Sequence, residues 1–182
     1  MVLLLASFAF GYPPVDGIPF ATREEQVFGS SPNQTRFELS RQQNSEYSDA
    51  LIAQAIEASS RLSMIAIFKA DPNRRQCSVG DTVELYEVSV GTLNDPSRFP
   101  AKFMADYAEG RGPLWGFYDP RAAESRIDSI VVSSHGLSED YHILVHEMAH
   151  YWYAVYCMNY VGQQTSEQFA EMIADQTSWS AQ

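Results

Sequence analysis

The stretch His146-Glu147-Met148-Ala149-His150 constrains this chain more than any other, because it sets two metal-binding side chains in an apolar run. Residues four apart on an α-helix lie about one turn apart on the same face. We therefore expect His146 and His150 to project side by side, close enough to share one metal ion. Glu147 lies on the neighbouring face, where its carboxylate can reach a water molecule on that ion without binding the ion itself.

The flanking residues favour a real metal site over a surface helix that carries two histidines by coincidence. The largely apolar residues 141–145 precede the motif, and Tyr151-Trp152-Tyr153 follows it. Buried polar groups need partners, and a metal ion would supply one. Two neutral imidazoles and one carboxylate, with a fourth position open for water, suit zinc. The sequence therefore predicts one zinc ion, with Glu147 as the general base that takes a proton from its water.

The third ligand is expected downstream of the motif, on the last predicted helix. His150 is the last histidine of the chain, and Tyr153 and Tyr156 stand where a metzincin carries its glycine and third histidine. A carboxylate remains, and Glu167 and Glu171 lie one turn apart. Glu167 has a competing explanation, because a negative side chain in the first turn of a helix is favoured by the helix dipole alone.

A resemblance to a known superfamily bears on this choice. Residues 171–175 read E-x-x-A-D, and together with the H-E-x-x-H they resemble the gluzincins, which include thermolysin. The resemblance covers about residues 114–178. It implies that Glu171 is the third zinc ligand and that Asp175 accepts a hydrogen bond from the far nitrogen of His146, fixing its tautomer. Glu167 stays open as the alternative ligand, because residues 166–170 are similar to the N-E-G-F-A of gluzincin aminopeptidases.

The pattern of helices and strands predicts an α+β fold, and the resemblance implies a minimal zincin-like domain. One packing helix is expected from Glu46 to about residue 70, and a strand is expected over residues 82–90. Two further strands should form an antiparallel hairpin, and two helices should carry the site. Their predicted ranges are 114–118 and 127–133 for the strands, 139–157 for a helix capped by Ser138, and 166–178 for a helix that begins with a T-x-x-Q capping box at Thr165.

The N-terminal part of the chain is expected to lie outside the catalytic domain, which spans residues 46–182. Residues 12–45 contain four prolines and many polar residues, which predicts an extended, mostly irregular segment wrapped on the domain or masking its site. Residues 1–11 are similar to the apolar part of a signal peptide, or else form a buried strand. We therefore expect a secreted or extracytoplasmic protein, with a cytoplasmic one as the alternative. Cys77 and Cys157 form one disulfide or remain two buried thiols.

The charge of the chain restricts its partners. With 12 Lys+Arg against 23 Asp+Glu, the net charge is −11, which argues against nucleic acid and against an anionic membrane surface. The main hypothesis is a monomeric zinc peptidase that acts on a peptide or protein substrate. The alternatives are a catalytically inactive metal-binding or interaction domain on a gluzincin fold, and a structural domain in which the motif is coincidence. The intact Glu147 argues against a mere metal holder.

Two features remain open at this stage. Residues 115–118 could pair with a substrate as an edge strand, because Gly116 lets another backbone approach, or they could form a plain core strand. His142 lies one turn before His146, where it could touch substrate or be a half-exposed surface histidine. It is not assigned a catalytic role.

Overall fold

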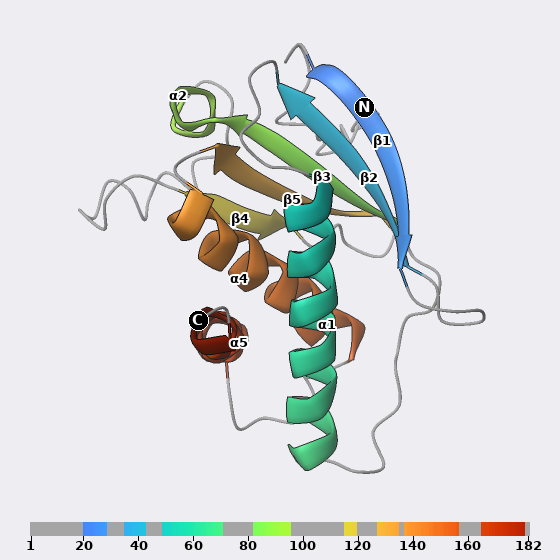
Figure 1. Ribbon diagram of the computed structural model, residues 1–182, viewed down its shortest axis with the longest axis vertical. Helices are drawn as coiled ribbons and strands as arrows, with labels where there is room; N and C mark the ends of the chain where they lie inside the picture. The colour runs from blue at the N-terminus through green and yellow to red at the C-terminus, as the bar shows by residue number, and fades with distance from the viewer. Residues whose placement is uncertain are drawn as a thin grey trace, which may run out of the picture.

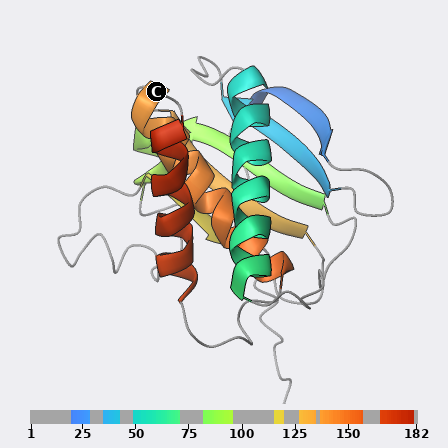
Figure 2. The same ribbon diagram turned by 60° about the horizontal axis from the view of Figure 1, so that its bottom comes forward.

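The chain folds into one mixed β-sheet with three long helices packed on a single face (Figures 1 and 2). The computed structural model describes residues 20–28, 35–42, 49–70, 82–95, 115–119, 127–134, 137–156 and 165–180. The signal-like residues 1–11 and both cysteines lie outside these ranges, so their predicted roles stay predictions. The predicted α+β class is confirmed.

The sheet has five strands in the order β1-β2-β3-β5-β4. Pairing is antiparallel between β1 and β2 and between β5 and β4, whereas β3 runs parallel to both β2 and β5. The predicted hairpin is confirmed, since Gly116 lies opposite Val132 and Tyr118 lies opposite Ile130. Strand β4 is therefore at one edge of the sheet. The strand bounds are Phe20–Phe28 for β1, Thr35–Gln42 for β2, Thr82–Ser89 for β3, Gly116–Asp119 for β4 and Ile127–Ser134 for β5.

The prediction that residues 12–45 are mostly irregular was wrong for the part that the structure describes. Strands β1 and β2 form a hairpin there, and β2 pairs with β3 inside the sheet. The missed signal is an alternation in β2, where Phe37 and Leu39 are buried and Arg36 and Glu38 are exposed. This segment supplies part of the sheet itself and is not a wrapping around a finished domain.

Helices α1 (Asp49–Ala70) and α4 (Leu137–Val155) cover the sheet, α5 (Ser166–Ser180) packs against α4 and α1, and a short α2 (Val90–Leu93) follows β3. The capping box at the start of α5 is confirmed. The Thr165 N–H donates to Gln168 Oε1 at 3.1 Å, and the Gln168 N–H donates to Thr165 Oγ1 at 3.2 Å. The predicted cap at Ser138 was wrong, because α4 begins one residue earlier and Ser138 lies in its first turn.

The core lies between the sheet and helices α1 and α4. Trp152 links the two helices, because its Nε1–H donates to Ser59 Oγ at 3.0 Å in a buried position. Helix α4 also packs against β4, β5 and α5, so it is held from three sides. The buried side chains on the helix-facing side include Phe37, Leu39, Val83, Leu85, Ile130 and Val132 of the sheet, Ile52 and Ile56 of α1, and Leu144, Val145 and Met148 of α4.

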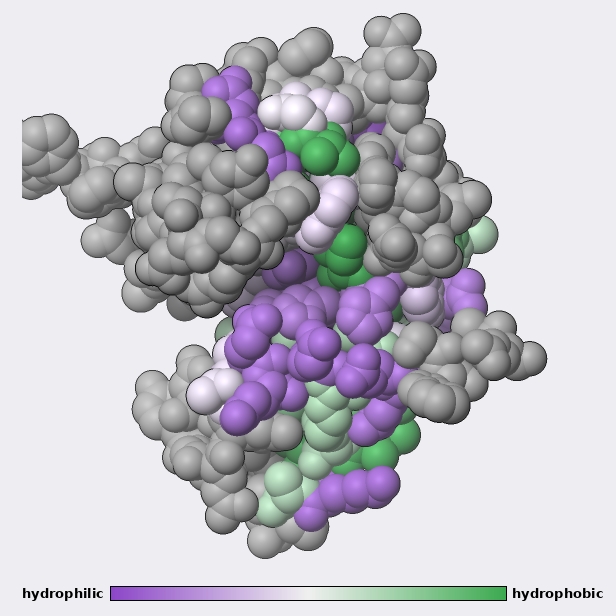
Figure 3. All heavy atoms as spheres, turned by 90° about the vertical axis from the view of Figure 1, so that its left-hand side faces the viewer, coloured by the Kyte–Doolittle hydropathy of each residue, from purple (hydrophilic) through white to green (hydrophobic). Residues whose placement is uncertain are grey.

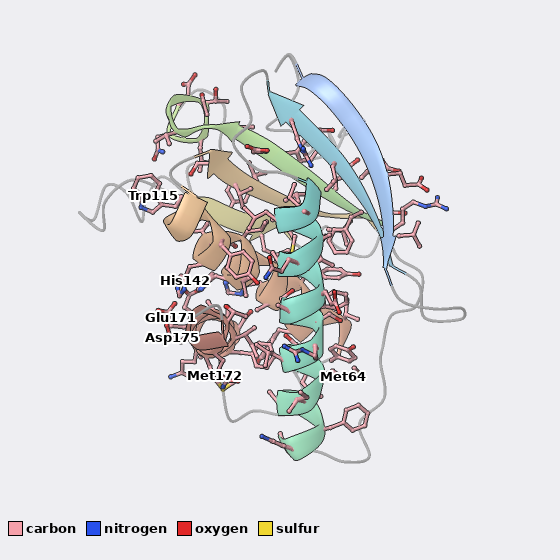
Figure 4. All side chains as sticks on the ribbon, in the orientation of Figure 1. Met64, Trp115, His142, Glu171, Met172 and Asp175 are labelled. Atoms are coloured by element: carbon pink, nitrogen blue, oxygen red, sulfur yellow. The ribbon has the colours of Figure 1, made fainter. Side chains whose placement is uncertain are left out.

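Helix α1 is also long and apolar enough, by length and composition, to cross a membrane. One side of it packs in the core through Ile52 and Ile56. Farther along, Met64, Ile65 and Phe68 are exposed large hydrophobic residues (Met64 is labelled in Figure 4). Core helices of soluble domains have the same composition, so this finding does not identify a membrane segment.

Candidate metal centre

Three side chains from α4 and α5 converge at one point between the helices. His146 Nε2 and His150 Nε2 lie 3.1 Å apart. Glu167 faces both, with Oε1 at 3.3 Å from His146 Nε2 and Oε2 at 3.3 Å from His150 Nε2. In a tetrahedral zinc site with bonds of about 2.0–2.1 Å, neighbouring ligand atoms lie about 3.3–3.4 Å apart. The spacing of these donor atoms therefore fits one tetrahedral metal ion, and the three residues form a group that could hold one.

Local helix geometry explains why these residues meet. His146 and His150 are four residues apart on α4, so both imidazoles leave the same face. Glu167 is the second residue of α5, and the capping box at Thr165 fixes where that helix begins. Helix α5 runs against α4 in the opposite direction, which brings its first turn to the last histidine. A first-turn position favoured by the helix dipole is thus also a position that reaches the histidine pair.

Each imidazole also has a partner at its other ring nitrogen. His150 Nδ1 lies 2.6 Å from Ser166 Oγ, and His146 Nδ1 lies 3.3 Å from Glu171 Oε2. An N–H at Nδ1 that donates to these oxygens leaves the Nε2 lone pair directed at the shared point, as metal binding requires. Sequence reasoning did not single out Ser166. Its position immediately before a candidate ligand, at the first residue of a helix, was the available signal.

Burial keeps His150 neutral. Desolvation, and then the nearby His146, lower the pKa of His150 to about 4, so its ring carries no charge near neutral pH. Neutral imidazole is the form that binds metal ions. The ring of Tyr118 on β4 lies parallel to the His150 ring, with an interplanar angle of 5° and centroids 6.4 Å apart. The strand therefore helps to fix the orientation of this imidazole.

The structure places the predicted carboxylates one helical turn away from their expected positions. Glu167, the alternative ligand, lies at the shared point, whereas Glu171, the preferred one, lies behind His146. Glu171 thus contacts the far nitrogen that the resemblance assigned to Asp175. Asp175 groups instead with His142 and Glu171. The physical reason is the starting point of α5, which brings its first turn, and not its second, level with the histidine pair.

Glu147 lies beside the site and is almost completely buried, with 7% of the residue exposed. Burial, and then the charge of Glu167, raise its pKa to about 8, while a hydrogen bond from the backbone of Tyr118 lowers it. A cation bound at the histidine pair would favour the carboxylate form. Gly116 makes room for this side chain, because a Cβ there would lie 3.0 Å from Glu147 Cγ and 3.0 Å from Ile143 Cγ2. The glycine thus accommodates the carboxylate itself, a reason that sequence reasoning did not give.

A polar surface continues from the site along α5. Figure 3 shows hydrophilic side chains gathered in the middle of this side of the molecule. Figure 4 shows His142 from α4 next to Glu171 and Asp175 from α5. An open cavity of about 600 Å³ lies along this side of α5, lined by Glu167, Gln168, Glu171, Met172, Asp175 and Gln176.

No protein-family model, curated protein or solved structure matches this chain. Its function has to be inferred from the chemistry of the cluster.

Proposed function

We propose that this protein is a zinc-dependent peptidase in which His146, His150 and Glu167 bind the ion and Glu147 is the general base. One observation carries the proposal. Two imidazole nitrogens and a carboxylate lie at mutual distances of 3.1–3.3 Å, and a buried glutamate lies beside them. Three protein ligands leave a coordination position for water or substrate, which distinguishes catalytic from structural zinc sites.

The donor set favours zinc among the common divalent ions. Imidazole nitrogen suits zinc, copper, iron and nickel, whereas magnesium and calcium take oxygen ligands. Zinc bound here would lower the pKa of its water towards about 7 and polarise the scissile carbonyl. Glu147 is the group that takes the proton from that water and delivers it to the leaving amine nitrogen. Its burial excludes competing water from the carboxylate.

Strand β4 supports a peptide as the substrate. Among the described strands it is the edge of the sheet nearest the site, and Gly116 lies against Glu147. The Ser133 N–H donates to Trp115 O at 2.9 Å, so the backbone groups of Gly116 point away from β5, on the side where the backbone of Tyr118 donates to Glu147. An extended peptide can pair with such an edge by β-augmentation. We infer that this pairing would hold the scissile bond near the ion.

A metal-binding domain without catalysis is the competing function. It accounts for the two histidines and Glu167, but it gives no reason for a buried carboxylate next to them. Burying an ionisable group costs free energy, so a domain that only holds metal gains nothing from Glu147. The position of Glu147 therefore favours the enzyme.

The decisive experiment compares wild-type protein with Glu147→Gln on a mixture of unstructured peptides, each loaded with zinc. We expect wild-type cleavage that stops with a chelator, and a 10²–10⁴-fold lower rate in the variant with unchanged zinc content. Glu57→Gln is the control, because Glu57 is exposed on α1 and its change removes one negative charge from a helix that carries none of the proposed ligands.

Three outcomes would contradict the proposal. A wild-type protein that binds zinc but cleaves no peptide would favour the non-catalytic domain. Full activity of Glu147→Gln would show that Glu147 is not the general base. A wild-type protein that binds no zinc would show that the three residues do not form a zinc site.

A further inference from the structure

We propose a second divalent cation site, formed by His142, Glu171 and Asp175, one helical turn along the same pair of helices. Each residue offers one ligand atom, and these atoms all lie within 4.8 Å of one another. Figure 4 shows the three labelled side chains together, His142 from α4 and the two carboxylates from α5. The proposal goes beyond the peptidase function and does not require the first site to be catalytic.

The two sites belong to one repeating arrangement. Histidines occur every fourth residue along one face of α4, at positions 142, 146 and 150, and carboxylates occur every fourth residue along one face of α5, at positions 167, 171 and 175. Residues four apart lie on one helix face, so each helix presents a row of ligands. Because the helices run in opposite directions, the two rows face each other, and the rows are long enough for two cations.

The charge of the two helices also indicates a bound cation. Neither helix sequence contains a lysine or arginine, while together they carry six acidic residues. Glu167, Glu171 and Asp175 lie four residues apart, a spacing at which like charges destabilise a helix. A divalent ion between Glu171 and Asp175 would remove that repulsion and use His142 as its third ligand.

The ligand set defines the class of ion. One imidazole and two carboxylates suit zinc or manganese better than calcium, which takes oxygen ligands. Glu171 and Asp175 are exposed, so water molecules can complete the coordination. Glu171 Oε2 also lies 3.3 Å from His146 Nδ1, so Glu171 contacts a ligand of the first site as well.

The test counts zinc ions per chain after chelator treatment and equilibration with Zn²⁺ alone, by elemental analysis and by calorimetric titration. His142→Ala/Asp175→Asn removes the second site, and His150→Ala/Glu167→Gln removes the first. Glu57→Gln is the charge control. We expect two ions in wild type and in the control, and one in each double variant. Thermal melting in chelator checks that every variant folds.

The outcomes separate this proposal from the peptidase. Binding of a single ion by wild type that His142→Ala/Asp175→Asn still binds, or of two ions by that variant, would overturn the second site. If His150→Ala/Glu167→Gln then binds none, the first site stands alone. If instead His142→Ala/Asp175→Asn binds none while the other variant binds one, the second site stands and the proposed zinc peptidase fails.

Discussion

Two regions of this molecule bring charged side chains together, and they do so in opposite ways. In the core, Arg41 on β2 and Glu87 on β3 are partners in the strand register, with Nε and Oε2 4.0 Å apart. Their side chains are only 11% and 2% exposed. Between α4 and α5, by contrast, the carboxylates of Glu167 and Glu171 are 74% and 59% exposed and face imidazoles.

The difference lies in the source of the positive charge. In the core the chain supplies both signs, because a buried charge without its counter-charge is strongly destabilising. At the helix pair the chain supplies carboxylates and imidazoles with no lysine or arginine on either helix, and the exposure of the carboxylates makes this arrangement tolerable. The first region thus carries its counter-charge within the chain, and the second is suited to a cation from solution.

The largest effect is expected from Glu167→Gln, measured in the His142→Ala background so that only the first site remains. Loss of a ligand should weaken zinc binding at least ten times more than Glu171→Gln does. Glu171 acts on the far nitrogen of His146, and changes at such supporting groups cost about 10–100-fold in affinity. Competition with a fluorescent zinc chelator measures both. The reverse order would return the ligand role to Glu171, as the sequence resemblance implied.

The next effect concerns the core pair. Arg41→Met removes the guanidinium beside the buried Glu87, and breaking a buried pair in this way costs about 3–5 kcal/mol. Urea unfolding should give the same loss with chelator and with zinc, because neither residue is a proposed ligand. A loss that zinc restores would mean that the two regions are coupled.

A smaller effect is expected from Ser166→Ala. This change removes the oxygen 2.6 Å from His150 Nδ1 but keeps the capping box of Thr165 and Gln168. Affinity for zinc should fall about 10–100-fold, or about 1.4–2.7 kcal/mol, while the melting temperature in chelator stays near that of wild type. Unchanged affinity would show that Ser166 does not orient the ring.

The smallest effect is expected when both partners of the core pair are replaced, in Arg41→Met/Glu87→Leu. Apolar side chains of similar size can replace a buried ion pair with a neutral or even stabilising outcome. The double variant should therefore recover most of the stability lost in Arg41→Met, as measured by urea unfolding. Failure to recover would mean that the pair contributes more than charge compensation to the sheet.

The sequence predicted the helices and strands with a strong periodic pattern and missed the strands that form only by pairing with a distant segment. The helix with His146 and His150, the capping box at Thr165 and the hairpin of β4 and β5 all follow from local patterns. Strands β1 and β2 carry charged residues and lie near prolines, so their local sequence does not stand out as a strand pattern. Their place in the sheet comes from the pairing of β2 with β3, which is distant in the sequence.

The choice between Glu167 and Glu171 shows the same limit within the site. Both lie on one face of α5, and helical spacing alone treats them equally. The position of α5 along α4 decides which of the two glutamates meets the histidines, and that position is set by the packing of the two helices. Local spacing therefore predicts the row of ligands, whereas the structure decides which member of the row meets the histidines.

The cap at the start of α5 has a consequence for how this protein tolerates changes of length. Two reciprocal hydrogen bonds between Thr165 and Gln168 set the first turn, whatever the chain before them does. Insertions before Thr165 should leave the carboxylates in phase with the histidines. One residue inserted between Gln168 and Glu171 would instead rotate Glu171 and Asp175 by about 100° and carry both off that face.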